Sequence, residues 1–246
     1  MSDAPLGTPA AARGRTGVPP QPQVQRVVVI TGGQGDLACA MHEEFARQGW
    51  RVLAPGRAEM DVRDGASVAA WFDSARKDLG VSRLDALIGN AGITRDCLLA
   101  RLDAQTLNDV LAVNLRGAYL CARAALPLME AAGGGALVWI GSYAARTGPA
   151  GLSAYAAAKA GLAGFSQSLA VELGAQNIRS NVVMPGFLRT KMTLDLAPTT
   201  VAGALESHAL GRFNTPQQAA RFVVMLCDME HVSGQVFQLD SRVGKW

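Results

Sequence analysis

The sequence is poor in the features that mark several large classes of protein. It has four cysteines, Cys39, Cys97, Cys121 and Cys227, with no Cys-x-x-Cys pair and no histidine at metal-ligand spacing. We therefore expect free thiols in a reducing compartment and no metal site. No apolar run approaches the roughly 18 residues that a membrane-spanning helix needs. The formal net charge is only +3, which is too small to indicate a nucleic-acid partner. These absences favour a soluble, cytoplasmic protein.

Residues 1–24 differ from the rest of the chain. They are rich in Pro, Gly and Ala, follow no hydrophobic period and contain no continuous apolar segment of the kind that a secretory signal has. We expect a disordered tail there. We expect one domain over residues 25–246, because this length and the 49% hydrophobic content suit a single α/β domain.

Short apolar runs alternate with amphipathic segments after the tail. Strands are predicted at 27–30, 51–54, 84–88, 136–140, 178–183 and 234–239, and helices at 37–48, 66–79, 107–130, 153–172 and 216–227. This alternation predicts a Rossmann-type α/β fold, a doubly wound parallel sheet of about seven strands flanked by helices. Residues 187–214 follow no period, and we expect them to form a mobile lid over a substrate.

Three side chains in the middle of the chain predict acid–base chemistry. Tyr155 and Lys159 are four residues apart on a predicted helix, which places them on one face. A phenol has a pKa of about 10, and a neighbouring cation lowers it. Ser142 follows a predicted strand, at the edge where open α/β sheets bind ligands. A lone Tyr-x-x-x-Lys pair is more often a surface pair, but the Ala-rich helix and the serine favour a general acid, a tuning cation and an orienting hydroxyl.

The first predicted strand leads through a glycine-rich turn, T-G-G-Q-G-D-L-A at 31–38, into a helix. Amides at such a helix N-terminus can face a pyrophosphate. After the second strand no acid stands before Glu59, although NAD-preferring enzymes place a carboxylate there for the ribose. Arg57 can instead pair with a 2′-phosphate, which favours NADPH over NADH, or it can be an ordinary surface arginine.

Two further positions carry polar groups in apolar surroundings. Asn90-Ala91-Gly92 ends the third predicted strand, where it can bring backbone close to a ribose or nicotinamide. Asn114 stands in the middle of a predicted helix among apolar neighbours, and this indicates a buried polar role.

Together these residues resemble the short-chain dehydrogenase/reductase family from about residue 26 to the C-terminus. The residues in that family's order and spacing are Thr31-Gly32, Asn90-Ala91-Gly92, Asn114, Ser142, Tyr155, Lys159 and Pro185-Gly186. The resemblance implies that Tyr155 donates a proton and that Lys159 binds the nicotinamide ribose. It implies that Ser142 steadies a carbonyl and that Asn114 holds a water linked to Lys159. It also implies cofactor contacts from Gly35, Asp36, Leu37, Asp61, Val62 and Thr190.

Within the family, the stretches 90–96 and 181–187 and the pair Asn114-Leu115 look like those of 3-oxoacyl-ACP reductases and acetoacetyl-CoA reductases. This implies NADPH-dependent reduction of a 3-oxoacyl thioester, as in fatty acid biosynthesis, by a homotetramer. Two other readings stay open. One is a dehydrogenase of another secondary alcohol, such as a sugar alcohol or a steroid, and the other is a scaffold subunit that binds cofactor poorly.

The sequence departs from this family in two places. Asp36 and Ala38 stand at the second and third glycine positions of the motif T-G-x-x-x-G-x-G. We expect Asp36 to cap the helix and turn away from the pyrophosphate. The link 130–136 has no base, and Gln176 stands where such reductases carry arginine. We therefore expect weak steering of an acidic acyl carrier protein, so that a CoA thioester or small ketone serves at least as well.

Overall fold

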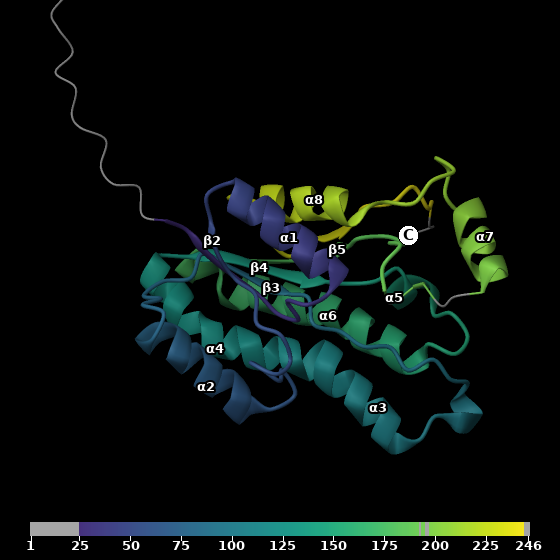
Figure 1. Ribbon diagram of the computed structural model, residues 1–246, viewed down its shortest axis with the longest axis horizontal. Coiled ribbons are helices and arrows are strands. Elements are labelled where there is room, and N and C mark those ends of the chain that lie inside the picture. The colour runs from purple at the N-terminus through teal and green to yellow at the C-terminus, as the bar shows by residue number, and fades with distance from the viewer. Residues whose placement is uncertain (1–24, 192, 195–196, 244–246) are drawn as a thin grey trace, which may run out of the picture.

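The computed structural model of the chain describes residues 25–191, 193–194 and 197–243, and its centre is a parallel sheet between two layers of helices (Figure 1). The tail expected at 1–24 lies outside the described residues. The strands are β1 (Val27–Ile30), β2 (Arg51–Leu53), β3 (Ala86–Gly89), β4 (Gly135–Ile140), β5 (Ile178–Met184) and β6 (Val236–Gln238). Their order in the sheet is β2-β1-β3-β4-β5-β6, and every neighbouring pair is parallel.

The described residues therefore form six strands, one fewer than the seven expected. The missing unit lies after β2, where the chain passes through a turn at 54–64 directly into helix α2 (Gly65–Lys77). No strand forms beyond β2 in this part of the chain, so β2 lies at the edge of the sheet. The fold class is as predicted, a doubly wound parallel sheet.

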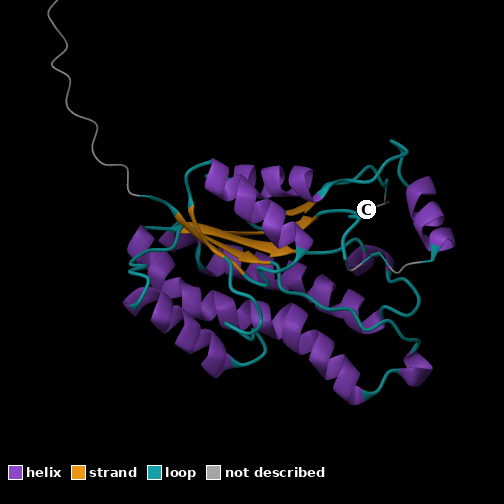
Figure 2. Ribbon diagram, in the orientation of Figure 1, coloured by secondary structure: helices purple, strands orange, loops and turns teal. Residues whose placement is uncertain are grey.

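Helices cover both faces of the sheet (Figure 2). Helices α1 (Asp36–Arg47) and α8 (Pro216–Asp228) lie on one face, and α2, α4 (Gly117–Ala132) and α6 (Ser153–Glu172) lie on the other. Helix α3 (Ala104–Leu111) precedes α4, and the short helices α5 (Ala144–Thr147) and α7 (Pro198–Glu206) lie at one end of the molecule. Helix α7 forms within residues 187–214, the segment for which no helix or strand was predicted. Among the described helices, none is long and apolar enough to cross a membrane.

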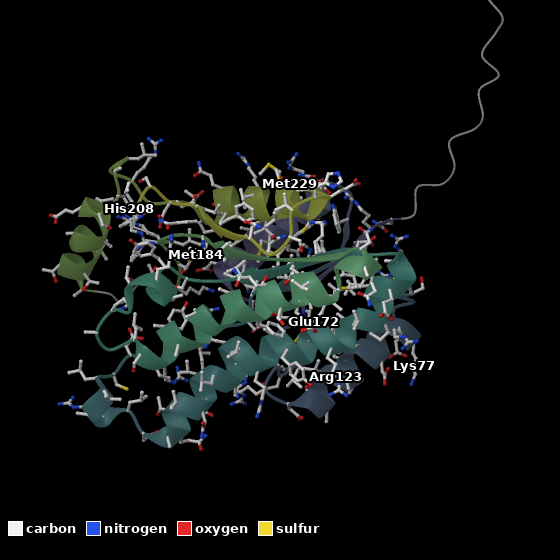
Figure 3. All side chains as sticks on the ribbon, turned by 180° about the vertical axis from the view of Figure 1, so that it is seen from behind. Lys77, Arg123, Glu172, Met184, His208 and Met229 are labelled. Carbon is white, nitrogen blue, oxygen red and sulfur yellow. The ribbon has the colours of Figure 1, made fainter. Side chains whose placement is uncertain are left out.

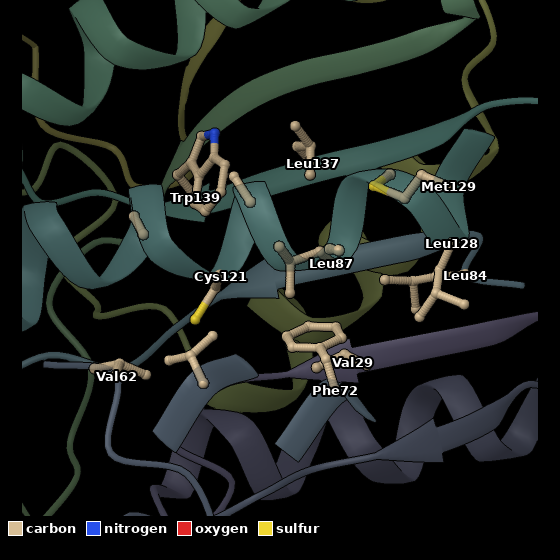
Figure 4. Packing of buried hydrophobic residues seen from close by; sticks show 14 of the residues in the cluster. Val29, Val62, Phe72, Leu84, Leu87, Cys121, Leu128, Met129, Leu137 and Trp139 are labelled. Carbon is tan, nitrogen blue, oxygen red and sulfur yellow. The ribbon is translucent and has the colours of Figure 1, made fainter. Parts of the chain in front are cut away.

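The core between the sheet and α2, α4 and α6 is closely packed. Val29, Phe72, Leu87 and Trp139 meet there, each at most 3% exposed (Figure 4). A Cβ on Gly89 would lie 2.3 Å from the ring of Trp139, so the strand end accepts this ring only because residue 89 is glycine. Tight packing makes the sheet a rigid base for the loops at its carboxyl edge.

The strand order identifies where those loops open. From β1 the chain moves to β2 on one side, and it then returns to place β3 on the other side of β1. Open α/β sheets bind ligands at such a switch point, outside the carboxyl ends of the strands. Thr31, Asn90, Ser142 and Pro185 all lie within two residues after a strand, at this edge.

Candidate active site

One buried hydroxyl ties the carboxyl ends of β1 and β3 together. Thr31 is 2% exposed, and its Oγ1 accepts hydrogen bonds from the backbone N–H of Asn90 at 3.0 Å and of Ala91 at 2.9 Å. The Asn90 side-chain amide donates to the Thr31 carbonyl at 3.0 Å. Gly32 has φ +67°, and a Cβ there would lie 3.0 Å from the Ala91 Cα. The structure thus brings four of the predicted cofactor residues together at the switch point.

Asn114 lies in a break between two helices. The helix expected over 107–130 is α3, then a π-helical turn at Ala112–Arg116, then α4. Asn114 is 2% exposed, and its Nδ2 donates to the carbonyls of Val110 and Ile93, both at 2.9 Å. Its Oδ1 has no partner among the described residues, which costs about 1–3 kcal/mol for a buried acceptor. A cavity of about 10 Å³ beside Asn114 matches one water molecule. The orphaned acceptor fits the water that the family resemblance implies; the cavity is lined by Thr31 and Val113 but not by Lys159, so it does not mark a link to the lysine.

Gly92 allows the side chains of Asn114 and Lys159 to approach the backbone closely. Lys159 is 4% exposed, and its Nζ donates to the Ile140 carbonyl, at the end of β4, at 2.7 Å. A Cβ on Gly92 would lie 2.8 Å from Asn114 Oδ1 and 3.5 Å from Lys159 Nζ. Burial lowers the pKa of Lys159 from 10.5 to about 8, so the group is still mostly an ammonium at pH 7. A buried acceptor and a cation thus lie on the same side of this glycine.

The Ser142 hydroxyl is close enough to the Tyr155 phenol to lower its pKa. Tyr155 lies one turn before Lys159 on α6, whose bounds match the predicted helix, and Lys159 Nζ is 5.8 Å from the centroid of its ring. Burial raises the pKa of Tyr155; the Ser142 hydroxyl, which lowers it, has a smaller effect, and the Asp96 carboxylate raises it further. The direction is opposite to the lowering that we expected from Lys159, because burial of the phenol prevails here.

Asp36 does not cap helix α1 as expected. The N-cap residue is Gly35, and Asp36 is the first residue inside the helix. Its Oδ2 accepts a hydrogen bond from the backbone N–H of Lys191 at 2.6 Å. The carboxylate therefore joins the glycine turn to the loop after β5, and the capping interpretation was wrong. Ala38 is fully buried between helix and sheet, as its small size allows.

The turn after β2 carries the basic and acidic side chains that bear on the binding of a ribose 2′-phosphate. The Arg57 side chain is 75% exposed, with Nε 3.5 Å from Asp61 Oδ2. Arg63 holds Asp61 more tightly, through Nε at 3.0 Å and Nη2 at 2.6 Å, and these hydrogen bonds lower the pKa of Asp61 to about 2. Glu59 folds back, so that its Oε2 accepts a hydrogen bond from the Gly56 N–H at 2.7 Å. Glu59 thus brings a carboxylate into this turn.

Two predicted cofactor residues have their side chains in the core. Leu37 packs between α1 and the sheet, and Val62 packs against α4, where a Cβ on Gly117 would lie 2.9 Å from it. At both positions only the backbone remains for a ligand.

The loop after β5 returns to the same edge. The Pro185 carbonyl accepts a hydrogen bond from Asn214 Nδ2 at 2.9 Å, Gly186 has φ +88°, and the Thr190 N–H donates to a threonine hydroxyl three residues on at 2.9 Å. The side chain of Asp240 packs on Gly186, where a Cβ would lie 2.8 Å from the Asp240 Cβ. The sequence analysis missed Asp240; its only local signal is an arginine two residues later.

The positions without bases and a group of exposed bases lie at opposite edges of the sheet. Gly133 and Asn177, joined by a hydrogen bond of 3.1 Å, lie at the amino edge, so the base-free positions 130–136 and 176 lie there too. The loops at the carboxyl edge carry exposed bases that pair with no acid of the described chain: Arg95, Arg101, Arg189, Lys191 and Arg212. The expectation of weak steering of an acyl carrier protein was drawn from positions 130–136 and 176. Within one chain, these positions are remote from the candidate site.

Comparison with known proteins finds reductases, both in the matching family profile and among the relatives. The profile of a family described as enoyl-(acyl carrier protein) reductase matches residues 26–241. The chain is 38% identical to carbonyl reductase family member 4 of Xenopus laevis, covering 88% of this chain and 97% of that protein. It is 32% identical to the 3-oxoacyl-[acyl-carrier-protein] reductase FabG of Escherichia coli (strain K12), covering 87% and 96%, and 37% identical to the FabG of Aquifex aeolicus (strain VF5), covering 87% and 85%.

Proposed function

Because the chain belongs to the short-chain dehydrogenase/reductase family, it is an NAD(P)-dependent oxidoreductase of carbonyl and CH–OH groups, and we propose that it reduces 3-oxoacyl thioesters to 3-hydroxyacyl products with NADPH. The observation that carries this proposal is the constellation at the switch point. Tyr155, with the Ser142 hydroxyl beside its phenol, lies one helical turn from Lys159, whose ammonium and Asn114 Oδ1 both approach Gly92.

The glycine turn and the loops around it would hold the cofactor. The turn 32–36 and the start of α1 would face the pyrophosphate, and Asn90, Ala91 and Lys159 would face the nicotinamide ribose. The backbone at Asp61 and Val62 would border the adenine, and the loop from Pro185 to Thr190 the carboxamide. A bound nicotinamide supplies the hydride, which is the difficult part of the chemistry.

The protein supplies orientation and a proton. Ser142 and Tyr155 would both donate to the substrate oxygen, where negative charge develops in the transition state. Tyr155 would then give up its proton to that oxygen. Its raised pKa makes the phenol a donor that stays protonated at neutral pH. Lys159 and the orphaned Asn114 Oδ1 lie on the path along which a replacement proton would arrive through water.

Arg57 supports the choice of NADPH. Its guanidinium is exposed and only loosely paired with Asp61, which Arg63 already neutralises. It is therefore available for a 2′-phosphate, which guanidinium binds well. Glu59, engaged with Gly56, stands where an acid would favour NADH, so NADH remains the alternative cofactor.

The bases at the carboxyl edge support a substrate that carries negative charge. Phosphates of coenzyme A and the acidic surface of an acyl carrier protein would both be attracted to Arg95, Arg101, Arg189, Lys191 and Arg212. The prediction that a CoA thioester serves at least as well as the carrier-bound form no longer follows from weak steering; it now rests on the attraction of these bases for the phosphates of coenzyme A. We also propose a cytoplasmic homotetramer that packs through α4 and α6; Val171 on α6, at 85% exposure, is consistent with this.

A second candidate function is reduction of small free ketones, or oxidation of another secondary alcohol. The similarity to a carbonyl reductase favours it, and the same catalytic residues would perform it. A scaffold subunit is less well supported, because a scaffold has no need of the Ser142, Tyr155 and Lys159 arrangement.

Turnover measured at the nicotinamide absorbance tests these readings. Acetoacetyl-CoA, acetoacetyl-ACP and a small ketone would be compared, each with NADPH and with NADH. We expect the highest kcat/KM with a thioester and NADPH, and we expect Tyr155→Phe to abolish turnover while cofactor fluorescence still reports binding. A large preference for the small ketone would favour the second function. Near-parental turnover by Tyr155→Phe would refute the assignment, and failure to bind either nicotinamide would revive the scaffold reading.

A further inference from the structure

The last described residues of the chain hold three pieces of the candidate site together. We define the C-terminal clasp as residues 238–242, which run on from the last residue of β6 at the carboxyl edge of the sheet. From this clasp we infer that Arg242 is a positioning residue that acts through Tyr143 on Ser142, and that Asp240 anchors it. The inference rests on the proposed function, because it assumes that Ser142 orients the substrate carbonyl.

The anchor is a buried carboxylate with several donors. The Asp240 side chain is 1% exposed, and it accepts hydrogen bonds from Gln238 Nε2 at 2.6 Å and from Arg242 Nε at 2.8 Å. Arg242 Nη2 makes a further, shorter contact. Burial alone would raise the pKa of Asp240, but the bonds from Arg242 and Gln238 outweigh it, so the pKa lies below its usual value. The carboxylate is thus ionised at neutral pH and fixes the guanidinium of Arg242.

The fixed guanidinium lies on the residue that follows the serine. The Arg242 Cζ is 3.8 Å from the ring centroid of Tyr143, a distance at which a cation is attracted to an aromatic face. Tyr143 is the N-cap residue of the short helix α5 and is bonded directly to Ser142, whose hydroxyl lies near the Tyr155 phenol. A second contact ties α5 to the clasp, because Arg146 Nη1 donates to Gln238 Oε1 at 3.0 Å.

The clasp also contacts the loops that follow β5. Asp240 packs on Gly186. The backbone N–H of Ala209 donates to the Ser241 carbonyl, and that of Leu210 donates to Ser241 Oγ, both at 3.1 Å. The neighbouring His208 is fully buried, with Nε2 3.7 Å from Asp240 Oδ2. Figure 3 shows His208 beside α7, at the end of the molecule opposite Lys77.

A role in stability alone does not explain this arrangement. A buried ion pair gains little net stability, because desolvation of two charges offsets their attraction. The ion pair does, however, hold the planar guanidinium of Arg242 in one place and one orientation against the ring of Tyr143. A positioned donor to the substrate oxygen is worth about 10²–10³ in kcat, and a displacement of about 1 Å can cost on the order of 10².

Two substitutions remove the contact between Arg242 and the Tyr143 ring in different ways. Arg242→Ala removes the cation but leaves Asp240 buried without its partner, so the protein can lose stability. Tyr143→Leu removes only the ring and keeps the buried pair intact. Arg221→Ala, on the exposed side of α8, is the matched control for loss of a cation. Each variant would be assayed with acetoacetyl-CoA and NADPH, after its melting temperature and cofactor affinity have been measured.

We expect Tyr143→Leu and Arg242→Ala to lower kcat at least tenfold, with NADPH affinity within twofold of the parent. Hydrogen exchange of residues 141–148 should be faster in both variants and unchanged in Arg221→Ala. The decisive measurement is a double-mutant cycle with Ser142→Ala. If Arg242 acts through Ser142, either substitution lowers kcat less than twofold in the Ser142→Ala background.

An equal loss of kcat in both backgrounds would show that the clasp only maintains structure, and it would overturn the inference. Unchanged kcat in a folded Tyr143→Leu variant would also overturn it. Parental activity of Ser142→Ala itself has a different meaning, since it would refute the proposed role of the serine. The two failures are therefore distinguishable.

Discussion

Replacing Lys159 by methionine should abolish turnover and yet stabilise the protein near neutral pH. The ammonium is 4% exposed, and burial lowers its pKa from 10.5 to about 8. This difference corresponds to about 3 kcal/mol of lost stability at pH 7, at 1.36 kcal/mol for each tenfold change in proton affinity. Methionine has a similar length without a charge, but it leaves the Ile140 carbonyl without its donor, which costs about 1–2 kcal/mol. The net gain is about 1 kcal/mol.

The sign of this effect should reverse with pH. Because the pKa of Lys159 is lower in the folded than in the unfolded protein, the unfolded chain binds more protons between pH 8 and 10.5, and parental stability rises across that window. At pH 7 the methionine variant should melt about 2–4 °C above the parent. Near pH 10.5 both side chains are uncharged, and the variant should melt below the parent because only it lacks the hydrogen bond to Ile140.

Calorimetry at pH 7, 8, 9 and 10 measures this difference. Lys77→Met is the matched control, since Lys77 is exposed on α2 (Figure 3), and its melting temperature should stay within about 1 °C of the parent at every pH. A methionine variant at position 159 that melts below the parent at pH 7, or whose difference from the parent does not change between pH 8 and 10, would refute the reasoning.

Three further outcomes follow from contacts in the site. Asp36→Gly should tighten NADPH binding about tenfold, because a carboxylate a few ångströms from a pyrophosphate costs roughly 1–2 kcal/mol of binding free energy. Titration by nicotinamide fluorescence measures the affinity, with Glu43→Gln on the same helix as control. Equal affinities of the parent and Asp36→Gly would contradict the prediction. Gly92→Ala should lower kcat at least tenfold and also lower the melting temperature, since its methyl would lie 2.8 Å from the buried Asn114 Oδ1 and displace it; full activity would show that the position of Asn114 is not needed. Arg57→Ala should weaken NADPH about tenfold and leave NADH binding unchanged, so an equal effect on both would remove Arg57 from the 2′-phosphate site.

The parts of the site that follow from local spacing were predictable from the sequence. Tyr155 and Lys159 lie on one face of α6 because they are four residues apart, and Ser142 lies at a strand end because an apolar run precedes it. These contacts depend on helical and strand geometry over a few residues. The predicted bounds of α6 agree with the structure for the same reason, since its Ala-rich pattern is continuous.

The contacts that the sequence did not predict join distant segments. Asp36 reaches Lys191, 155 positions away, so its fate depends on where the loop after β5 returns and not on capping preference. Asn114 bonds to Ile93, 21 residues earlier, so its burial depends on where the loop after β3 passes. The pKa of Tyr155 also depends on the burial created by the whole loop cluster. None of these can be derived from the spacing of neighbouring residues.

The wide turn at Ala112–Arg116 has a consequence for how this protein tolerates changes in length. It accommodates one more residue than an α-helical turn, so the residue pattern of α3 is offset by one from that of α4 while both helices follow one path. Deleting that one residue would restore a regular turn and leave the two helix faces nearly unchanged, so Val110 would keep its packing against Ala154 and Ala158. The deletion would instead remove the wide turn that holds Asn114 beside Ile93, so that the fold would persist without this part of the candidate site.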